Sequence, residues 1–219
     1  MKKISKNFKV PKSQSPKIIF CLFFFLQNLL LEAPAHFEEK ISQLICISRY
    51  RDENIKILEK KFSKNFDYYD RIPLDLESRA VPHCLILIDD FEQELTSDRE
   101  LLKMTYSFAA YVTHHLPCTL IMVCQSYSMF YASSKLHQAL FQATMLILFK
   151  SHSSMNILKR VLNSFNVKIR NGDTLFQVFK EYCSGSHRYI VLNLHPSLDS
   201  VQVYSNILYN CKESFIMFT

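Results

Sequence analysis

Residues 84–90 read CLILIDD, an apolar run that ends abruptly in the two aspartates Asp89 and Asp90. An uninterrupted run of this kind is typical of a strand that is covered on both faces, as strands of a parallel sheet are. Two similar runs follow, TLIMVC at 119–124 and MLILF at 145–149, and the residues after them are Gln125 and Lys150. The three runs predict a buried parallel sheet whose strands end in polar side chains.

Amphipathic helices are predicted for three segments whose apolar residues recur every three or four positions, namely 54–66, 157–165 and 175–182. The pattern Ser97-x-x-Glu100 is typical of a capping box and predicts one more helix start. Residues 40–48 and 189–192 predict further strands, whereas 67–82, with two prolines, predict a loop. Strands that alternate with helices indicate an α/β fold, and no repeat or Gly/Ser-rich linker divides it.

The glycine content excludes one large class of enzymes. The 219 residues are enough for one α/β domain with a core, but they include only two glycines, Gly172 and Gly185, and no Gly-Lys dipeptide. A Rossmann fingerprint or a Walker A loop needs several glycines at a strand-to-helix turn, so neither is present. A complete P-loop enzyme is excluded by the sequence as it stands.

The net charge of +6 comes from the N-terminus, because the first 17 residues contain six lysines and no acid. The rest of the chain has 20 basic and 20 acidic residues. A basic tail suits loose attraction to nucleic acid or anionic lipid, whereas the body has no cationic excess that would predict a DNA-binding domain.

Residues 1–35 also contain an apolar stretch at 18–31 and the triplet Ala33-Pro34-Ala35, which together outline a secretory signal. The stretch is short for a transmembrane helix and is broken by Gln27-Asn28. The alternatives are a buried strand and helix start, or sequence foreign to the functional protein. We therefore treat residues 1–35 as a basic and hydrophobic N-terminal segment and 36–219 as the α/β domain.

The cysteines and histidines suggest no separate site. Seven cysteines are scattered without a C-x-x-C pair, and four of them lie in or beside apolar runs. This favours core cysteines in a reducing compartment over disulfides or a metal site. The pair His114-His115 near Cys118 lacks a matching second cluster, which favours a polar helix end over a zinc site.

The polar strand ends supply the candidate site, because ligands of open parallel sheets bind beyond the carboxyl ends of the strands. An apolar strand that ends in two acids is what Walker B chemistry needs. Asp89 would hold Mg²⁺, and Asp90 would orient or deprotonate the attacking water. Gln125, after the neighbouring run, would sense the γ-phosphate or position that water. The alternative is that the aspartates only end a strand and cap the next turn.

From about residue 38 to residue 210 the chain resembles the DNA-packaging ATPases of Polinton/Maverick transposons and related large DNA viruses. These enzymes belong to the FtsK/HerA group and are related to the poxvirus packaging ATPase. The resemblance rests on five blocks that occur in the family's order, namely LILIDDF at 85–91, HHLP at 114–117, IMVCQ at 121–125, LILFK at 146–150 with Lys159 and Arg160 after it, and YIVLNLHP at 189–196.

The resemblance implies a three-layer parallel sheet of the P-loop NTPase type. It also implies ATP and Mg²⁺ as cofactors. The implied partners are double-stranded DNA, a homo-oligomeric ring and capsid components, with no stable membrane partner. Family members open with a Walker A loop before the paired acids, where this chain has residues 17–34 without a glycine. Ser126 replaces an Asn of the family pattern, Asn193 replaces an Asp, and Arg188 replaces a Gly.

The missing loop has two consequences. Without its backbone N–H groups and its lysine the phosphates lose their main support, so hydrolysis by this chain alone is not expected. The sheet is expected to be incomplete at the N-terminus, unless 17–26 replaces the central strand that precedes the loop.

Three interpretations of function follow. The first is a truncated or degenerate packaging ATPase, and the second is a non-hydrolytic assembly subunit of the same fold. The third is a secreted or membrane-tethered protein that uses residues 1–35. The first two place the protein inside the cell, in the nucleus, the cytoplasm or a virion-like particle.

Overall fold

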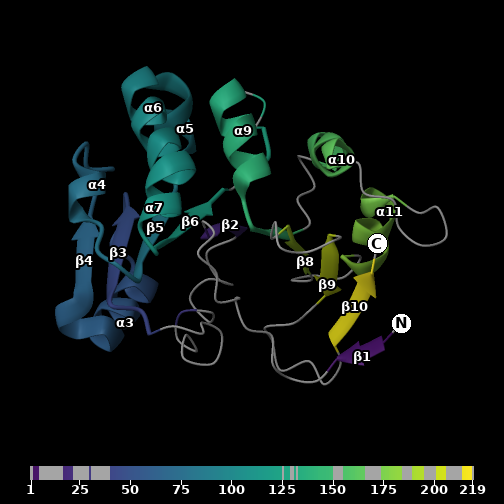
Figure 1. Cartoon of the computed structure of the whole chain (residues 1–219), viewed down its shortest axis with the longest axis horizontal. Helices are drawn as coiled ribbons and strands as arrows, with labels where there is room; N and C mark the ends of the chain where they lie inside the picture. The colour runs from purple at the N-terminus through teal and green to yellow at the C-terminus, as the bar shows by residue number, and fades with distance from the viewer. Residues whose placement is uncertain are drawn as a thin grey trace.

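The computed structural model describes residues 2–4, 17–21, 30, 40–124, 126–128, 131, 133–149, 155–165, 174–183, 189–194, 201–205 and 214–218. Its strands form one ten-stranded sheet in the order β1-β10-β9-β8-β7-β2-β6-β5-β3-β4 (Figure 1). Their bounds are β1 Lys2–Ile4, β2 Lys17–Cys21, β3 Gln43–Ser48, β4 Phe66–Tyr69, β5 Cys84–Asp89, β6 Thr119–Val123, β7 Met145–Phe149, β8 Tyr189–Asn193, β9 Gln202–Ser205 and β10 Ser214–Phe218.

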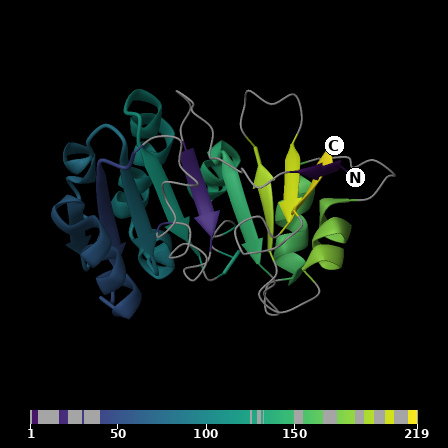
Figure 2. The same ribbon diagram turned by 90° about the horizontal axis from the view of Figure 1, so that it is seen from below.

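Six strands, β7-β2-β6-β5-β3-β4, run parallel to one another. The predicted α/β class with a parallel sheet is therefore confirmed, and the three apolar runs are its strands β5, β6 and β7. The strand β2 lies between β6 and β7, with Ile19 opposite Ile121 on one side and Met145 on the other (Figure 2). The exception left open by the sequence thus applies, because residues 17–21 occupy the central position.

The other half of the sheet is antiparallel, which the sequence did not predict. The strand β8 pairs antiparallel with β7, and β9, β10 and β1 continue the same alternation. Between β7 and β8 the residues that the structure describes form the two helices α10 (Met155–Ser164) and α11 (Leu175–Tyr182). A pair of helices brings the chain back at the opposite end of the sheet from a single crossover helix, so the next strand runs in the reverse direction.

Helices cover both faces of the sheet, which makes three layers (Figure 1). Successive residues of each strand face opposite sides, so Ile86 and Ile88 pack in one core and Leu85 and Leu87 in the other. The first core is covered by α5 (Glu92–Ser97), α6 (Arg99–Ser107), the π-helical turn η2 (Phe108–Val112), α9 (Ser134–Gln142), α10 and α11. The second core contains Leu30 and the apolar side of α3 (Glu53–Phe62). Burial on both faces explains why the strand sequences are apolar without interruption.

The predicted loop at 67–82 is in part a strand. The helix α3 ends at Ser63, whose positive φ of 49° turns the chain, and the short helix η1 (Ser63–Asn65) leads into β4. The strand β4 pairs parallel with β3 at the edge of the sheet. Its aromatic residues Phe66, Tyr68 and Tyr69 favour a strand over a loop. The helix α4 (Leu76–Arg79) follows.

The predicted capping box at Ser97 and Glu100 is wrong. Ser97 is the last residue of α5, and Asp98 caps α6 by accepting hydrogen bonds from the N–H groups of Glu100 and Leu101 at 2.9 and 3.0 Å. An aspartate at this position caps as well as a serine, so the sequence pattern was one residue out of register. The short helix α7 (Thr113–His115) ends the run of helices before β6.

Candidate functional site

The candidate site lies where the strands β3, β5 and β6 end. Asp89 is the last residue of β5, and in the sheet it stands opposite Ser48 of β3 and Val123 of β6. Because these strands are parallel, their carboxyl ends meet at one edge, as predicted for a ligand site. Asp89 and Asp90 are both partly buried at this edge. The sequence therefore placed the two aspartates correctly.

Burial is the largest cause that raises the pKa of Asp89, to about 7, and the negative charges of Asp90, Asp52 and Glu92 add to it. The ionised form of this carboxyl is unfavourable because it is desolvated and surrounded by other acids. A group in such surroundings gains the most from a cation that neutralises the charge. The electrostatics of the edge thus suit a divalent cation better than an anion.

Asp90 occupies a sharp turn between β5 and α5. Its φ of 64° lies in the left-handed region, which costs about 1 kcal/mol for most residues and is tolerated best by Gly, Asn and Asp. Phe91, the next residue, is only 4% exposed and packs in the first core. The turn therefore fixes the backbone of Asp90 directly beside Asp89.

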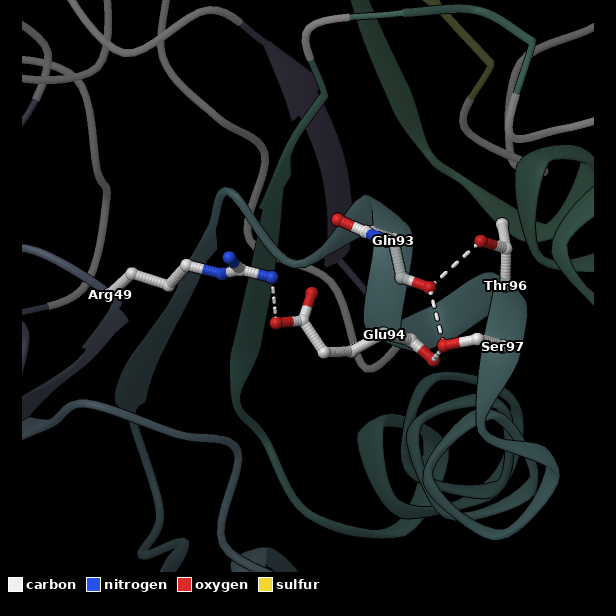
Figure 3. Close-up of polar contacts among 5 residues, drawn as sticks. All are labelled: Arg49, Gln93, Glu94, Thr96 and Ser97. Atoms are coloured by element: carbon white, nitrogen blue, oxygen red, sulfur yellow. Dashed lines mark hydrogen bonds and ion pairs between the residues drawn. The ribbon is translucent and has the colours of Figure 1, made fainter.

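An ion pair fastens the segment after the aspartates to the neighbouring strand. Arg49, which follows the end of β3, donates from Nη2 to Oε1 of Glu94 on α5 (Figure 3). Its guanidinium carbon also lies 6.0 Å from the centre of the Phe91 ring, within reach of a cation–π contact. Arg49 was not predicted as a site residue, because Glu94 is 45 positions away and comes close to it only through the pairing of β3 with β5.

Hydroxyl side chains form hydrogen bonds with the backbone in the last turn of α5. Thr96 and Ser97 both donate to the carbonyl oxygen of Gln93, at 2.9 and 2.8 Å, and Ser97 also reaches the carbonyl of Glu94 at 3.5 Å (Figure 3). Side chains that bind carbonyls three or four residues earlier satisfy the last turn of a helix. The helix that presents Glu92 and Glu94 is therefore short and locally determined.

A second contact joins the same segment to the end of β6. The carboxylate oxygen Oε1 of Glu92 accepts a hydrogen bond from the backbone N–H of Ser126 at 3.1 Å. Gln125, the residue between β6 and Ser126, lies outside the described residues, and so does Lys150 after β7. The predicted proximity of Gln125 to Asp90 therefore stays a prediction.

Tyr127 connects the ends of β6 and β7. Its hydroxyl donates to the carbonyl oxygen of Phe149 at 2.8 Å and accepts from the N–H of Phe149 at 3.2 Å. Burial is the largest cause that raises the pKa of this hydroxyl, so it stays protonated and able to donate. One side chain thus satisfies both backbone groups of the last residue of β7.

The part of the chain that the structure describes holds no complete metal centre made of side chains. Among the residues that the structure describes, no group of three or more histidines, cysteines, aspartates and glutamates could hold a metal ion together. His115 is exposed at the end of α7 whereas Cys118 is 5% exposed, in keeping with the expected helix end. A cation at Asp89 would take most of its ligands from water, which is usual for Mg²⁺.

We expect the ion pair of Arg49 and Glu94 to contribute about 1 kcal/mol to folding, the upper end for partly exposed pairs. Their side chains are 35% and 33% exposed, and the Phe91 contact adds to the Coulomb attraction. A double-mutant cycle with Arg49→Met and Glu94→Gln in urea measures this coupling. The same cycle on the more exposed pair of Lys56 and Glu53 should give no measurable coupling, and an equal value for both pairs would contradict the expectation.

Comparison with known proteins gives a weak likeness to a solved structure. No protein-family model matches the chain, and no curated protein matches its sequence. Among solved structures, the chain is similar to the Thermomonospora curvata EccC (ATPases 2 and 3) in complex with a signal sequence peptide, with 13% identity and a TM-score of 0.45. The match covers 94% of this chain and 36% of that one, so this chain spans about a third of its length. A TM-score below 0.5 does not establish a shared fold, and the fold described above rests on the strand order alone.

Proposed function

We propose that this chain is a degenerate P-loop NTPase domain of the DNA-packaging type, which keeps a cation-binding acidic strand end and does not hydrolyse ATP by itself. The observation that carries the proposal is the pair Asp89 and Asp90 at the carboxyl end of β5 in a parallel sheet. The central position of β2 adds support, because the phosphate-binding loop of the family follows a central strand.

The residues present fit a cation but not a triphosphate. Asp89 and Asp90 offer carboxylate oxygens, the ligands that Mg²⁺ prefers, in surroundings that disfavour an unneutralised charge. The eight residues after β2 read LFFFLQNL at 22–29, with neither the glycines nor the lysine that would cradle phosphates. We therefore derive no hydrolytic step for this chain.

The roles of the residues follow from their positions. Asp89 would hold the cation, directly or through water, and a bound Mg²⁺ would supply positive charge to an anionic ligand. Asp90, fixed by its turn, would accept a hydrogen bond from a water molecule at the same edge. Arg49 and Glu92 would keep the Asp90 turn in place through Glu94 and Ser126. Gln125 would complete the site as the predicted sensor.

The first test is cation binding by the full-length protein, measured with Mn²⁺ by calorimetry. We expect Asp89→Asn to weaken binding by at least about tenfold, which corresponds to about 1.4 kcal/mol. Binding by the unchanged protein should also weaken by roughly tenfold between pH 8 and pH 6, because Asp89 takes up a proton near pH 7. Asp70→Asn, at an exposed acid that pairs with Arg71 at 3.5 Å, is the matched control. Equal affinities for both variants would contradict a site at Asp89.

The second test is ATP hydrolysis, with Asp90→Asn as the comparison because asparagine tolerates the same backbone turn. We expect the unchanged protein and this variant to hydrolyse ATP at the same background rate. A rate that depends on Asp90 would contradict the absence of hydrolysis and favour an active enzyme.

The partners belong to the same proposal and come from the family resemblance. A ring of like subunits around double-stranded DNA inside the cell is the assembly that we propose, with capsid components as further partners. No helix among the described residues is long and apolar enough to cross a membrane. Sedimentation of the protein with and without duplex DNA tests the ring, and a monomer under both conditions would contradict it.

A further inference from the structure

Two cysteines lie side by side at the amino ends of β5 and β6. They are at the opposite end of these strands from the acidic edge, the carboxyl end of β5 that carries Asp89 and Asp90. Cys84 is the first residue of β5, and Cys118 directly precedes β6. The strands are paired with Leu85 opposite Thr119, so the register sets the two cysteines opposite each other. Both side chains pack in the first core, so they lie on the same face of the sheet. Neighbours in adjacent strands have the separation of α-carbons, 4.4–6.8 Å, that disulfides span.

The two thiols influence each other unequally. The interaction with Cys118 is the largest cause that lowers the pKa of Cys84, and the interaction with Cys84 is the largest cause that raises the pKa of Cys118. Cys84 is therefore the better nucleophile, since the thiolate is the reactive form. By contrast, burial raises the pKa of Cys46, on the neighbouring strand β3, to about 12.

Each cysteine of the pair is buried and directly follows an exposed residue. Cys84 and Cys118 are 1% and 5% exposed, but His83 before Cys84 and Pro117 before Cys118 are both exposed. The N–H of His83 donates to the carbonyl of Pro117 at 2.6 Å, which holds the two segments together. His83 has a φ of 63°, an unfavourable conformation for most residues with a β-carbon. An oxidant can reach Cys84 only when this turn opens.

We propose that Cys84 and Cys118 are a redox-active pair that forms a reversible disulfide with a small disulfide oxidant, such as oxidised glutathione. The thiolate of Cys84 attacks one sulfur of the oxidant, forms a mixed disulfide and releases one glutathione thiolate. Cys118 then loses its proton to that thiolate and attacks the sulfur of Cys84, which releases the second glutathione. Two protein thiols are oxidised, and the oxidant is reduced to two thiols.

The disulfide would join the start of β5 to the start of β6 without moving the acidic edge. Both residues already lie opposite each other in the register and in the same core, so the bond needs no change in the pairing of the strands. A reversible disulfide suits a compartment in which thiols are normally reduced. There the bond would form only during an oxidising episode and would be reduced again afterwards.

The test uses the folded full-length protein, first reduced and then incubated with oxidised glutathione. Free thiols are alkylated, and tryptic peptides are mapped by mass spectrometry. Trypsin leaves Cys84 in the peptide 80–99 and Cys118 together with Cys124 in 104–135, and fragment ions separate the last two. We expect one link, between Cys84 and Cys118, that reduced glutathione reverses.

Two variants separate the roles of the pair. Cys118→Ser should accumulate the glutathione adduct at Cys84, by roughly tenfold over the unchanged protein, because no second thiol displaces it. Cys84→Ser should leave Cys118 unmodified, and Cys46→Ala should not affect the link. If both thiols stay open to alkylation after incubation with oxidised glutathione, or if the link joins other residues, the proposal is overturned. The mapping of the unchanged protein decides this even where a variant fails to fold.

Discussion

Asp89→Asn is expected to stabilise the protein at pH 8 by as much as about 4 kcal/mol and to leave its stability unchanged below pH 4. In the folded protein the pKa of Asp89 is raised to about 7 from an ordinary value of 3.8, and each unit corresponds to about 1.4 kcal/mol. The folded state therefore holds a proton that the unfolded state has lost between these two values. The free energy of unfolding falls as the pH rises from about 4 to about 7 and is level above that.

The asparagine variant has no titratable group at this position, so its free energy of unfolding does not show this fall with pH. Urea unfolding of both proteins at pH 4, 6 and 8 measures the difference, which should grow from near zero through the interval. Asp70→Asn, at an exposed position, should follow the unchanged protein at every pH. A constant difference between Asp89→Asn and the unchanged protein would contradict the raised pKa. Saturating Mg²⁺ should narrow the difference at pH 8, because it stabilises only the protein that keeps the carboxylate.

Tyr127→Phe is the second change with a large expected effect, a loss of about 2 kcal/mol in the free energy of unfolding. The hydroxyl of Tyr127 serves both the N–H and the carbonyl of Phe149, so its removal leaves two backbone groups at the end of β7 without this partner. A buried polar group that loses its partner costs about 1–3 kcal/mol. Thermal or urea unfolding measures the loss.

Tyr50→Phe is the matched control, since Tyr50 is 71% exposed, and it should change stability by less than about 0.5 kcal/mol. Amide hydrogen exchange adds a local readout. In Tyr127→Phe, exchange in the middle of β5 should speed up only as far as the measured loss of global stability requires, whereas exchange at Phe149 should speed up further, because the end of β7 also opens locally. Equal acceleration at both places would show that the hydroxyl acts on global stability alone.

The buried strands were predictable because their side chains have to be apolar on both faces of the sheet. The bounds of β5, β6 and β7 were predicted from the sequence to within one residue. The position of Asp89 and Asp90 where β5 ends was predicted as well. A run such as CLILI has few alternatives inside a folded domain, since each of its side chains needs an apolar partner on its own face. Such segments are specified locally, and their strand ends are therefore visible in the sequence.

The parts that were not predicted depend on tertiary contacts. β4 forms because an edge is available on β3, and Phe66 and Tyr68 read from sequence alone as part of a helix end and a loop. The antiparallel direction of β8 depends on the path of α10 and α11, which no residue of β8 encodes. Arg49 became a site residue only when β3 was placed beside β5, since Glu94 is 45 positions away in the chain.

The position of β2 has a consequence for the order in which the sheet can be completed. Ile19 pairs with Ile121 and Met145, more than a hundred residues later in the chain. Contacts across such separations form late and slowly, because the entropy of closing a long loop is lost before the contacts stabilise the chain. During synthesis the residues of β2 must wait until both of its neighbours have left the ribosome. Until β2 is inserted, the facing edges of β6 and β7 stay unpaired, and unpaired strand edges of this kind can pair with another molecule.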